Sequence, residues 1–401
     1  MTELQPLFLR HLAQTSDEPL LLEITHAKGC VLFGPQERSW LDLISGISVS
    51  NMGHGHPDIV QAVQEQAAKY MHVMVYGEFV ESPQVQYATW LANHLPGEID
   101  SVYFVNSGSE AVEGAIKLAK RATGRTEIVS FQHGYHGSTA AALVTGGNEE
   151  RKRAFRPLPP DNLILPFNDI NSIGQISHRT AAVLVELIQG EAGIRPADEA
   201  FIQELAYRCR VVGALLIVDE CQTGFGRTGK MFAAEHYDLK PDIMILGKAL
   251  GGGMPLGAFA AGKDLMQMLT TQPVLGHITT FGGHPVCCAA GLASASLITT
   301  ELLQQVEEKG KFLEEKLHHP AIKEIRRRGL MMVVDLPDEP FNKAVIRRMI
   351  TKGVVTDWFL FHDNGLRIAP PLVITVPELE FAARLLLESL DEVQKELHSV
   401  N

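Results

Sequence analysis

Short apolar runs alternate with longer stretches of helical pattern through the middle of the chain. The helical stretches predict helices at 109–122 and 199–211. The apolar runs are four to seven residues long and predict buried strands. Strands that alternate with helices are typical of a parallel sheet covered by helices on both faces, so we predict an α/β fold. The predicted strands are 102–105, 127–131, 181–187, 214–218 and 243–246.

The pattern changes after about residue 287. A long helical stretch is followed by the strand-like run "LMMVVDL" at 330–336, and helical sequence continues towards the C-terminus. A chain of 401 residues is long enough for about two domains. We predict a large domain over 52–286 and a smaller one formed by 1–51 together with 287–401.

Composition narrows the classes of protein. The chain carries 47 acidic and 35 basic side chains, and its net charge of -12 would repel nucleic acid. Its five cysteines are odd in number and lack metal-type spacing, which argues against a disulfide framework and favours a reducing compartment. There is no signal-like N-terminal pattern and no run of 18 apolar residues. We therefore expect a cytoplasmic protein without nucleic-acid or membrane partners.

Each predicted strand is followed by polar or glycine-rich residues. The carboxyl ends of parallel strands meet at one edge of a sheet, which is where ligands bind in such folds. Five polar strand ends at one edge indicate a ligand with several different chemical demands. These segments are 106–109, 134–137, 186–191, 219–222 and 247–248, and they contain His136 and Glu186.

Two of these segments suit charged parts of a ligand. Ser107, Gly108 and Ser109 open a predicted helix, whose N-terminal N–H groups can bind an anion such as phosphate, although a serine N-cap explains Ser107 equally well. Asp219 follows the buried run "ALLIV", where a carboxylate needs a cationic partner. A protonated ring nitrogen is one such partner, and Arg227 is the alternative.

The stretch "ILGKALGGGMPLG" places Lys248 directly after the last predicted strand, among glycines. Tyr135 offers an aromatic face at the same edge, although simple packing also explains a loop tyrosine. A phosphate cup, a carboxylate for a ring nitrogen, a stacking face and a lysine are what pyridoxal phosphate requires. We therefore predict this cofactor, with Lys248 forming the Schiff base to it.

Two other motifs suggest different chemistry. The glycines of 224–229 match the G-x-G-x-x-G pattern of nicotinamide-dependent oxidoreductases, but they begin well after the strand that ends at Val218. His54 and His56 in "GHGHP" suggest a metal, but no third ligand stands at a recognisable spacing. We therefore disfavour a dinucleotide site at 224–229, expect a turn at "GHGHP" and predict no metal site.

Six motifs together resemble the class III aminotransferases, the ornithine, acetylornithine and 4-aminobutyrate group of the fold type I pyridoxal phosphate enzymes. The resemblance covers nearly the whole chain. It implies a large domain with a mostly parallel sheet and a smaller α+β domain. The motifs, in the family's order, are "WLDLISGISVSNMGHGHP", "YFVNSGSEAVEGAIKLAK", "GYHGST", "VDECQTGFGRTG", "ILGKALGGGMPLGA" and "TTFGGHP".

The resemblance implies roles at the cofactor. Lys248 would bind the cofactor covalently, Asp219 would pair with the pyridine nitrogen, and Gln222 would lie near the ring hydroxyl. By the same resemblance Thr280 would reach the phosphate of a neighbouring subunit, which implies a homodimer with shared sites. With the strand-end residues, the cofactor candidates are Ser107, Gly108, Ser109, Tyr135, His136, Glu186, Asp219, Gln222, Lys248 and Thr280.

The resemblance also implies how substrates bind. Arg367 in "LRIAPPL" matches the arginine that holds the α-carboxylate of glutamate or 2-oxoglutarate, and Glu191 matches the glutamate that pairs with it when an amine occupies the site. Tyr76 would line the substrate entrance. One position departs from the family: a basic residue usually follows the position of Gly137, and here it is Ser138.

These residues predict a pyridoxal-phosphate-dependent aminotransferase of amino acid metabolism. It would move an amino group, by a two-stage exchange, from ornithine, acetylornithine or another terminal-amine donor to a keto acid such as 2-oxoglutarate. One alternative is an aminomutase of the glutamate-semialdehyde type, and a less favoured one is the nicotinamide-dependent oxidoreductase. A catalytically silent relative is a third, against which the presence of both Lys248 and Asp219 argues.

Overall fold

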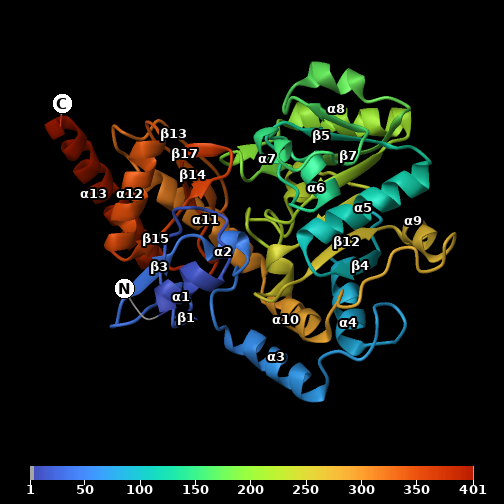
Figure 1. Ribbon diagram of the computed structural model, residues 1–401, viewed down its shortest axis with the longest axis horizontal. Coiled ribbons are helices and arrows are strands. Elements are labelled where there is room, and N and C mark those ends of the chain that lie inside the picture. The colour runs from blue at the N-terminus through green and yellow to red at the C-terminus, as the bar shows by residue number, and fades with distance from the viewer. Residues whose placement is uncertain (1–3, 401) are drawn as a thin grey trace.

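The structure is a computed structural model that describes residues 4–400. Two lobes lie side by side (Figure 1). The middle of the chain forms the larger lobe, while both ends of the chain come together in the smaller one.

A seven-stranded sheet forms the centre of the larger lobe. Its order is β4-β12-β11-β10-β7-β5-β6, and only β12 runs antiparallel to its neighbours. The predicted α/β architecture with a mostly parallel sheet is therefore confirmed. The strands are β4 (Ser101–Val105), β5 (Glu127–Phe131), β6 (Asn162–Leu165), β7 (Thr180–Val185), β10 (Leu215–Asp219), β11 (Ile243–Leu246) and β12 (Gly257–Ala261).

Sequence patterning identified five of these strands and missed β6 and β12. Strand β12 has the sequence "GAFAA", whose small residues and leading glycine resemble a loop. The glycine has a packing reason, because a Cβ at Gly257 would lie 2.1 Å from the carbonyl oxygen of Ser107. The start of β12 therefore lies directly against the start of the helix that follows β4.

Both predicted helices of the larger lobe are present as α5 (Gly108–Thr123) and α8 (Glu199–Val212). Helix α5 begins where the sequence predicts, because Ser107 Oγ accepts a hydrogen bond of 3.2 Å from the Glu110 N–H. It ends at Gly124, whose φ of +67° suits a left-handed helix cap. The helix thus places its N-terminus at the carboxyl end of β4.

A second layer of helices packs near β4 and β12. It contains α3 (Pro57–Lys69), α4 (Ser82–Ala92) and α10 (Pro285–Ser296). Cys288 of α10 belongs to the same apolar core as Phe104 and Leu250. The predicted boundary between residues 286 and 287 would cut this helix. The division into two domains stays a prediction, and we propose that its boundary falls after α10, near Ile298.

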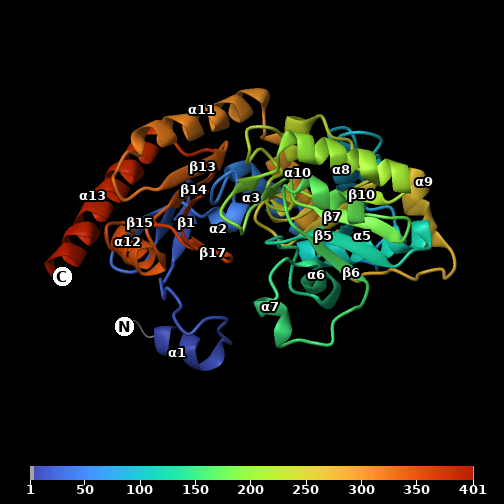
Figure 2. The same ribbon diagram turned by 90° about the horizontal axis from the view of Figure 1, so that it is seen from above.

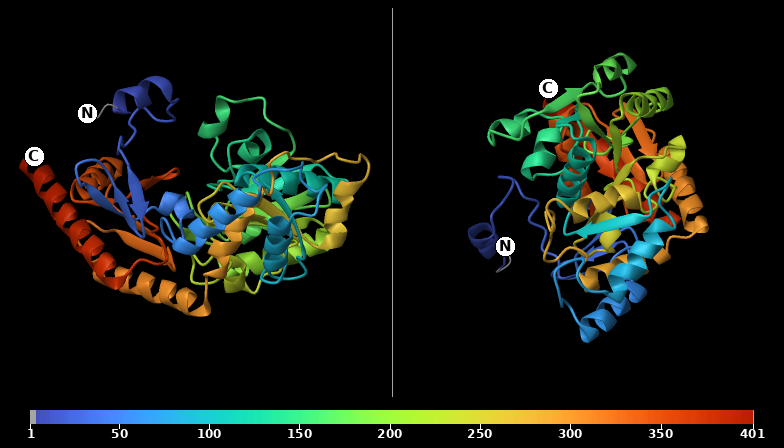
Figure 3. Two further views of the ribbon diagram at one scale, coloured as in Figure 1. Left: turned by 90° about the horizontal axis from the view of Figure 1, so that it is seen from below. Right: turned by 90° about the vertical axis from the view of Figure 1, so that its right-hand side faces the viewer.

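The smaller lobe contains two four-stranded sheets. One has the order β13-β14-β17-β16, and the other, β1-β2-β3-β15, joins N-terminal strands to a C-terminal one. Helices α11 and α13 run along the outer side of this lobe (Figure 3). The elements are β1 (His26–Lys28), β2 (Val31–Phe33), β3 (Ser39–Asp42), α11 (Thr300–Lys316), β13 (Glu324–Arg328), β14 (Met331–Asp335), α12 (Glu339–Thr351), β15 (Val354–Val355), β16 (Trp358–Phe359), β17 (His362–Ile368) and α13 (Val376–Val400).

The remaining elements are short and connect these layers. Helices α1 and α7 project from the same side of the molecule (Figure 2). No single helix in residues 4–400 is long and apolar enough to span a membrane; α10 and α11 meet the length and composition criteria only together, with a bend of 74° between them. The short elements are α1 (Leu4–His11), α2 (Ser45–Ser48), α6 (Ala140–Thr145), α7 (Glu150–Arg153), η1 (Ile170–Gln175), β8 (Ile188–Gln189), β9 (Arg195–Pro196), η2 (Ala233–Tyr237), η3 (Lys248–Gly251), α9 (Lys263–Met266) and η4 (Gln267–Thr270).

Candidate active site

The sheet brings the predicted strand ends together. Asp219 at the end of β10 is paired with Ile245 of β11, and the end of β7 is the other neighbour of β10. Strand β4 runs in the same direction as β11, with β12 between them. The segments that follow β4, β5, β7, β10 and β11 therefore leave the sheet at one edge.

Lys248 begins the short helix η3 immediately after β11. Its φ is +49°, a region that residues with side chains rarely adopt, so its surroundings hold the backbone there. The side chain is partly buried, and its charge helps to lower the pKa of Glu191. Within residues 4–400 the Lys248 amine makes no hydrogen bond or ion pair. The amine is therefore available to a ligand at the strand ends.

Asp219 pairs with His136 rather than with an arginine. Its Oδ2 lies 2.8 Å from His136 Nδ1, and its Oδ1 accepts a hydrogen bond of 3.0 Å from the Cys221 N–H. Burial opposes ionisation of Asp219, which is 5% exposed, but the hydrogen bond and charge of His136 outweigh it and lower its pKa. Burial also opposes protonation of His136, and Asp219 in turn raises the pKa of that ring. A carboxylate can accept about four hydrogen bonds, so Asp219 can take a further donor.

Arg227, the alternative partner of Asp219, lies elsewhere, and that alternative is wrong. Its guanidinium is fully buried and donates to the carbonyl oxygens of Leu330 at 2.9 Å and Pro370 at 2.6 Å, and to Asn51 Oδ1 at 2.6 Å. The glycine motif 224–229 around it consists of turns, and the next helix after β10 begins only at Ala233. The segment therefore lacks the strand–turn–helix form that a dinucleotide site needs.

Glu186 connects two loops of the site. Its Oε2 accepts a hydrogen bond of 2.9 Å from the Tyr135 N–H, and its Oε1 accepts one of 3.1 Å from the Gly190 N–H. Burial raises the pKa of Glu186 to about 7, and the charge of Asp219 contributes to the rise. The carboxyl group thus holds the Tyr135 loop against the segment that carries Glu191.

Glu191 and Arg367 form a buried two-point ion pair. Arg367 Nη1 and Nη2 donate to the two carboxylate oxygens of Glu191 at 3.1 and 2.9 Å, and Arg367 Nε donates to Asp357 Oδ1 at 2.8 Å. Burial opposes ionisation of Glu191, but the charge and hydrogen bonds of Arg367 outweigh it and lower the pKa of Glu191 to about 2. Sequence patterning missed Asp357, whose role depends on the pairing of β16 and β17.

Gln222 stands between this ion pair and the strand ends. Its Nε2 donates to Glu191 Oε1 at 3.0 Å. Its Oε1 is buried and has no hydrogen-bond partner in the described part of the chain. A buried acceptor without a partner is costly, so this oxygen calls for a donor such as a hydroxyl group. We call Lys248, Asp219, His136, Glu186, Gln222, Glu191 and Arg367 the inner cluster.

The N-terminus of α5 borders the inner cluster. Ser107 Oγ is used as the N-cap, whereas the N–H groups of Gly108 and Ser109 have no acceptor among residues 4–400. Ser109 Oγ accepts a hydrogen bond of 3.3 Å from the Ser138 N–H. Gly137 must be glycine here, since a Cβ would lie 2.0 Å from Ser109 Oγ. The helix end and the loop around Gly137 thus form a surface suited to an anion.

Two predicted site residues make their contacts away from the inner cluster. The Tyr76 hydroxyl donates to the Val102 carbonyl at 3.2 Å and accepts from the Phe104 N–H at 3.3 Å, so it covers the free edge of β4. Thr280 is exposed, and its carbonyl oxygen lies 2.8 Å from His72 Nε2. The entrance role of Tyr76 and the phosphate role of Thr280 stay predictions.

A cavity of about 620 Å³ opens beside Tyr135. Its walls include Ser138, Arg151, Phe155 and Phe361. The Tyr135 and Phe361 rings are tilted, with their centroids 6.5 Å apart. We call this the outer cavity. Sequence patterning missed Arg151 and Phe361, because a single arginine in a polar stretch resembles surface sequence.

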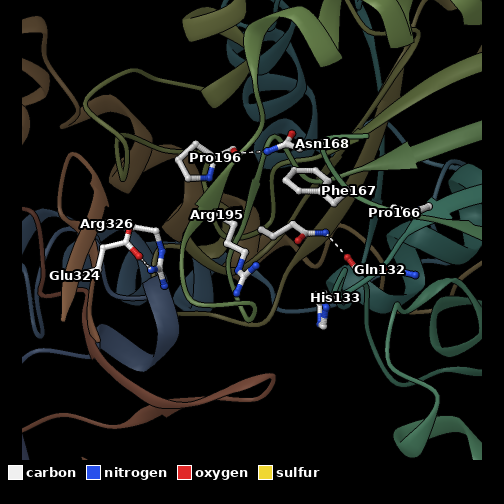
Figure 4. Close-up of a pocket in the computed structure, with 10 residues that line it drawn as sticks. Gln132, His133, Pro166, Phe167, Asn168, Arg195, Pro196, Glu324 and Arg326 are labelled. Carbon is white, nitrogen blue, oxygen red and sulfur yellow. Dashed lines mark hydrogen bonds and ion pairs between the residues drawn. The ribbon is translucent and has the colours of Figure 1, made fainter. Parts of the chain in front are cut away.

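A second cavity, of about 490 Å³, lies where hairpin β8–β9 meets β13 (Figure 4). Arg195, Glu324 and Arg326 are among its walls, and it contains no residue predicted for the cofactor.

His54, one of the two histidines that suggest a metal in the sequence, has its Nε2 2.8 Å from Asp42 Oδ2. Residues 4–400 contain no group of three side chains suited to hold a metal ion.

Comparisons with known proteins agree with this arrangement. A family model described as "Aminotransferase class-III" matches residues 12–390. The acetylornithine aminotransferase of Methanopyrus kandleri is 40% identical over 369 residues, which cover 90% of this chain and 92% of that protein. The acetylornithine aminotransferase of Bacillus subtilis is 38% identical over 376 residues, which cover 92% and 95%.

Solved structures give the same result. A transaminase from the marine bacterium Virgibacillus matches with a TM-score of 0.93 at 25% identity and covers 99% of this chain and 100% of that one. An ornithine aminotransferase from Toxoplasma gondii, with partial occupancy of pyridoxal phosphate at its active site, matches with a TM-score of 0.90 at 27% identity, covering 98% and 94%.

Proposed function

The chain belongs to the class III aminotransferases, a fold type I family that depends on pyridoxal phosphate, and we propose that it transfers an amino group from an acetylornithine- or ornithine-type terminal amine to 2-oxoglutarate. The names of the relatives support the donor class. The observation that carries the proposal is the unpaired Lys248 amine at the end of β11, the neighbour of the strand that ends in Asp219, a carboxylate held ionised by His136.

The unpartnered oxygen of Gln222 supports a fit to this cofactor, because the cofactor's ring hydroxyl is a donor for it. When bound, the cofactor supplies an electron sink for the carbon that carries the amino group. Asp219 would accept a hydrogen bond from the protonated ring nitrogen and so keep that nitrogen protonated, and the free N–H groups of Gly108 and Ser109 would bind the phosphate. The Tyr135 ring would stack on the cofactor ring.

Lys248 has two tasks in this proposal. Its amine holds the cofactor between reaction cycles. When a donor displaces it, the same amine removes the proton from the donor's amino-bearing carbon and later returns a proton, acting first as general base and then as general acid. The absence of any partner for the amine within residues 4–400 leaves it able to move between these tasks.

The Glu191–Arg367 pair would distinguish the two substrates. With a terminal-amine donor in place the pair stays closed. With a keto acid, Arg367 would bind the α-carboxylate in place of Glu191, which suits the planar, two-point geometry of its guanidinium. Because the pKa of Glu191 is about 2, this exchange is a change of partners rather than a protonation.

The visible absorption spectrum tests this function. The protein supplied with pyridoxal phosphate should be yellow, and the colour should bleach with L-glutamate and with N-acetylornithine, ornithine or 4-aminobutyrate. A protein that stays colourless would overturn the cofactor role of Lys248. An aminomutase would turn over one substrate without added keto acid, whereas the proposed exchange stops after one half-reaction.

We further propose a homodimer in the cytoplasm. Exposed apolar side chains gather on the segment 71–80, where Val80 is 93% exposed, and on the segment 274–281 around Thr280. The Tyr76 N–H donates to the Thr279 carbonyl at 3.3 Å, so the two segments form one face. Covering this face with a second copy would bring Thr280 of the partner subunit towards the phosphate. Sedimentation should give a dimer, and a monomer at micromolar concentration would contradict it.

The five free cysteines support the cytoplasmic location, because thiols stay reduced in that compartment.

A further inference from the structure

The outer cavity has an unusual distribution of charge. Arg151 of α7 is the one charged side chain among the residues that line it within the described chain. Most of the other walls are apolar. Leu143 comes from α6 before α7, Phe155 follows α7, and Leu360 and Phe361 precede β17. A cavity of this kind suits a ligand with an apolar chain and one anionic end.

Arg151 forms no ion pair in residues 4–400, and the one carboxyl group on whose pKa its charge is seen to act, that of Asp363, does not line the cavity. Its guanidinium lies 5.6 Å from the centre of the Phe361 ring, and its Nη2 is 3.5 Å from the Leu360 carbonyl. Of the two acids that precede it in the chain, Glu149 pairs with Lys152 and Arg156, and Glu150 makes no ion pair with Arg151. The Phe361 ring and the Leu360 carbonyl thus orient a cation whose charge remains available to a ligand.

The outer cavity is directly connected to the inner cluster. Tyr135 lines the cavity, and its N–H donates to Glu186. On the opposite wall, the Leu360 N–H donates to Glu191 Oε2 at 3.2 Å, and the Phe361 N–H donates to the Glu191 carbonyl oxygen at 3.0 Å. Two walls of the outer cavity are therefore hydrogen-bonded to carboxyl-bearing residues of the inner cluster, which makes the two regions direct neighbours.

We propose that Arg151 binds the carboxylate at the far end of the amino donor. In this role Arg151 would replace the basic residue that usually follows the position of Gly137 in this family and that is Ser138 in this chain. The inference rests on the proposed function and narrows its substrate class to a primary amine on a short apolar chain that ends in a carboxylate. The apolar walls receive the methylene groups, and Arg151 receives the charge. Arg367 is not available for this task, because Glu191 and Asp357 already hold its guanidinium.

The test compares two donors that differ only in the carboxylate, 5-aminopentanoate and pentylamine. In Arg151→Gln, kcat/KM for 5-aminopentanoate should fall roughly 10- to 100-fold, the range expected for a charge-assisted hydrogen bond. For pentylamine it should change less than about twofold. Arg151→Lys keeps the charge and should restore most of the difference, mainly through KM. Arg153→Gln is the matched control, because Arg153 is exposed on the same helix and does not line the cavity.

Binding of pentanoate, which has the carboxylate but no amine, gives a second readout by calorimetry. Its dissociation constant should rise by a similar factor in Arg151→Gln and stay unchanged in Arg153→Gln. Equal losses for both donors, or no loss for 5-aminopentanoate, would overturn the role of Arg151. A wild-type enzyme inactive with every amine would overturn the proposed function instead, while the pentanoate measurement would still decide whether Arg151 binds a carboxylate.

Discussion

The inner cluster and the outer cavity adjoin each other and are built in opposite ways. In the inner cluster each carboxyl group is buried and bonded to another part of the chain, as with Asp219 to His136 and Glu191 to Arg367. In the outer cavity a single exposed cation, Arg151, forms no ion pair among the described residues, and no acid lines the cavity with it. In the first region the charges of Asp219, Glu191 and Arg367 are fixed by partners within the chain, and the second leaves a charge for a ligand to satisfy.

The difference follows from what each region has to do. Proton transfer and charge stabilisation need groups of known charge in known positions, and burial with fixed partners provides both. A buried ion without a partner is strongly unfavourable, so the inner cluster pairs its own charges. An exposed arginine keeps its water, so leaving Arg151 unpaired costs little. Four substitutions test this comparison, from the largest expected effect to the smallest.

Replacing Lys248 by alanine should have the largest effect. It removes the only amine of the inner cluster, so kcat should fall by at least roughly a thousandfold, since both acid–base and covalent catalysis are lost. The yellow colour of the protein should disappear with it. Circular dichroism should be unchanged, because the amine makes no hydrogen bond or ion pair within residues 4–400. A variant that keeps a tenth of the activity would contradict the role of Lys248.

Asp219→Asn should lower kcat by roughly 100- to 1000-fold, the size of effect seen when one preorganised electrostatic partner is removed. It should also change His136. In the wild type burial lowers the pKa of His136, and the hydrogen bond and charge of Asp219, with a smaller contribution from Glu186, raise it. Without the charge of Asp219 only Glu186 opposes burial, so the pKa of His136 should fall. An NMR titration of the His136 ring, without added cofactor, measures this directly. A His136 pKa that stays raised would show that another group holds its proton.

Glu191→Gln opens the buried ion pair and should have an intermediate effect. Arg367 then loses its two-point partner, so KM for 2-oxoglutarate should fall and KM for the terminal amine should rise, each by about tenfold. Leaving Arg367 underpaired should also destabilise the protein.

The stability difference between wild type and Glu191→Gln depends on pH. The pKa of Glu191 is about 2 in the folded protein and ordinarily about 4.3, so its contribution is fully present above about pH 4.3 and is lost as the pH falls towards 2. Urea unfolding at several pH values checks this. A difference independent of pH would mean that the pair does not stabilise the fold through its charge.

Ser138→Arg should have the smallest effect. It adds a second cation to the outer cavity, so KM for carboxylate-bearing donors should fall about two- to fivefold. The half-reaction with L-glutamate should not change, because the inner cluster is unaltered. Ser138→Gln separates the added charge from the added size. If Ser138→Arg impairs glutamate as strongly as the donors, the two regions are not independent.

The candidate site could be predicted where its signals are local. Ser107, Glu110 and Gly124 mark the two ends of α5 by hydrogen bonding and backbone geometry within the helix itself. Lys248 and Asp219 were identified because each directly follows an apolar run that could only be a buried strand. Strand β12 was missed because its small residues carry a weak local signal, although it separates β4 from β11 and so sets the width of the site.

The partner of a buried charge is not a local property. For Asp219 the sequence left Arg227 as a candidate, whereas the fold supplies His136, 83 positions away, and uses Arg227 to bind carbonyl groups of Leu330 and Pro370. Arg367 likewise reaches Glu191 across 176 positions. Such pairs depend on how strands and loops assemble, and no periodicity or spacing encodes them.

By itself the sequence determined the α/β architecture and the edge of the sheet at which Lys248 and Asp219 lie, because apolar runs alternate with helical stretches and the carboxyl ends of parallel strands meet at one edge. Its motifs identified the family. The tertiary structure alone decided which groups hold Asp219 and Glu191 ionised, what raises the pKa of Glu186, and that Arg151 lies beside Phe361 without an ion pair in the described chain. The physical reason is that protonation and charge selection depend on burial and on neighbours within a few ångströms, and only the folded chain brings those neighbours together.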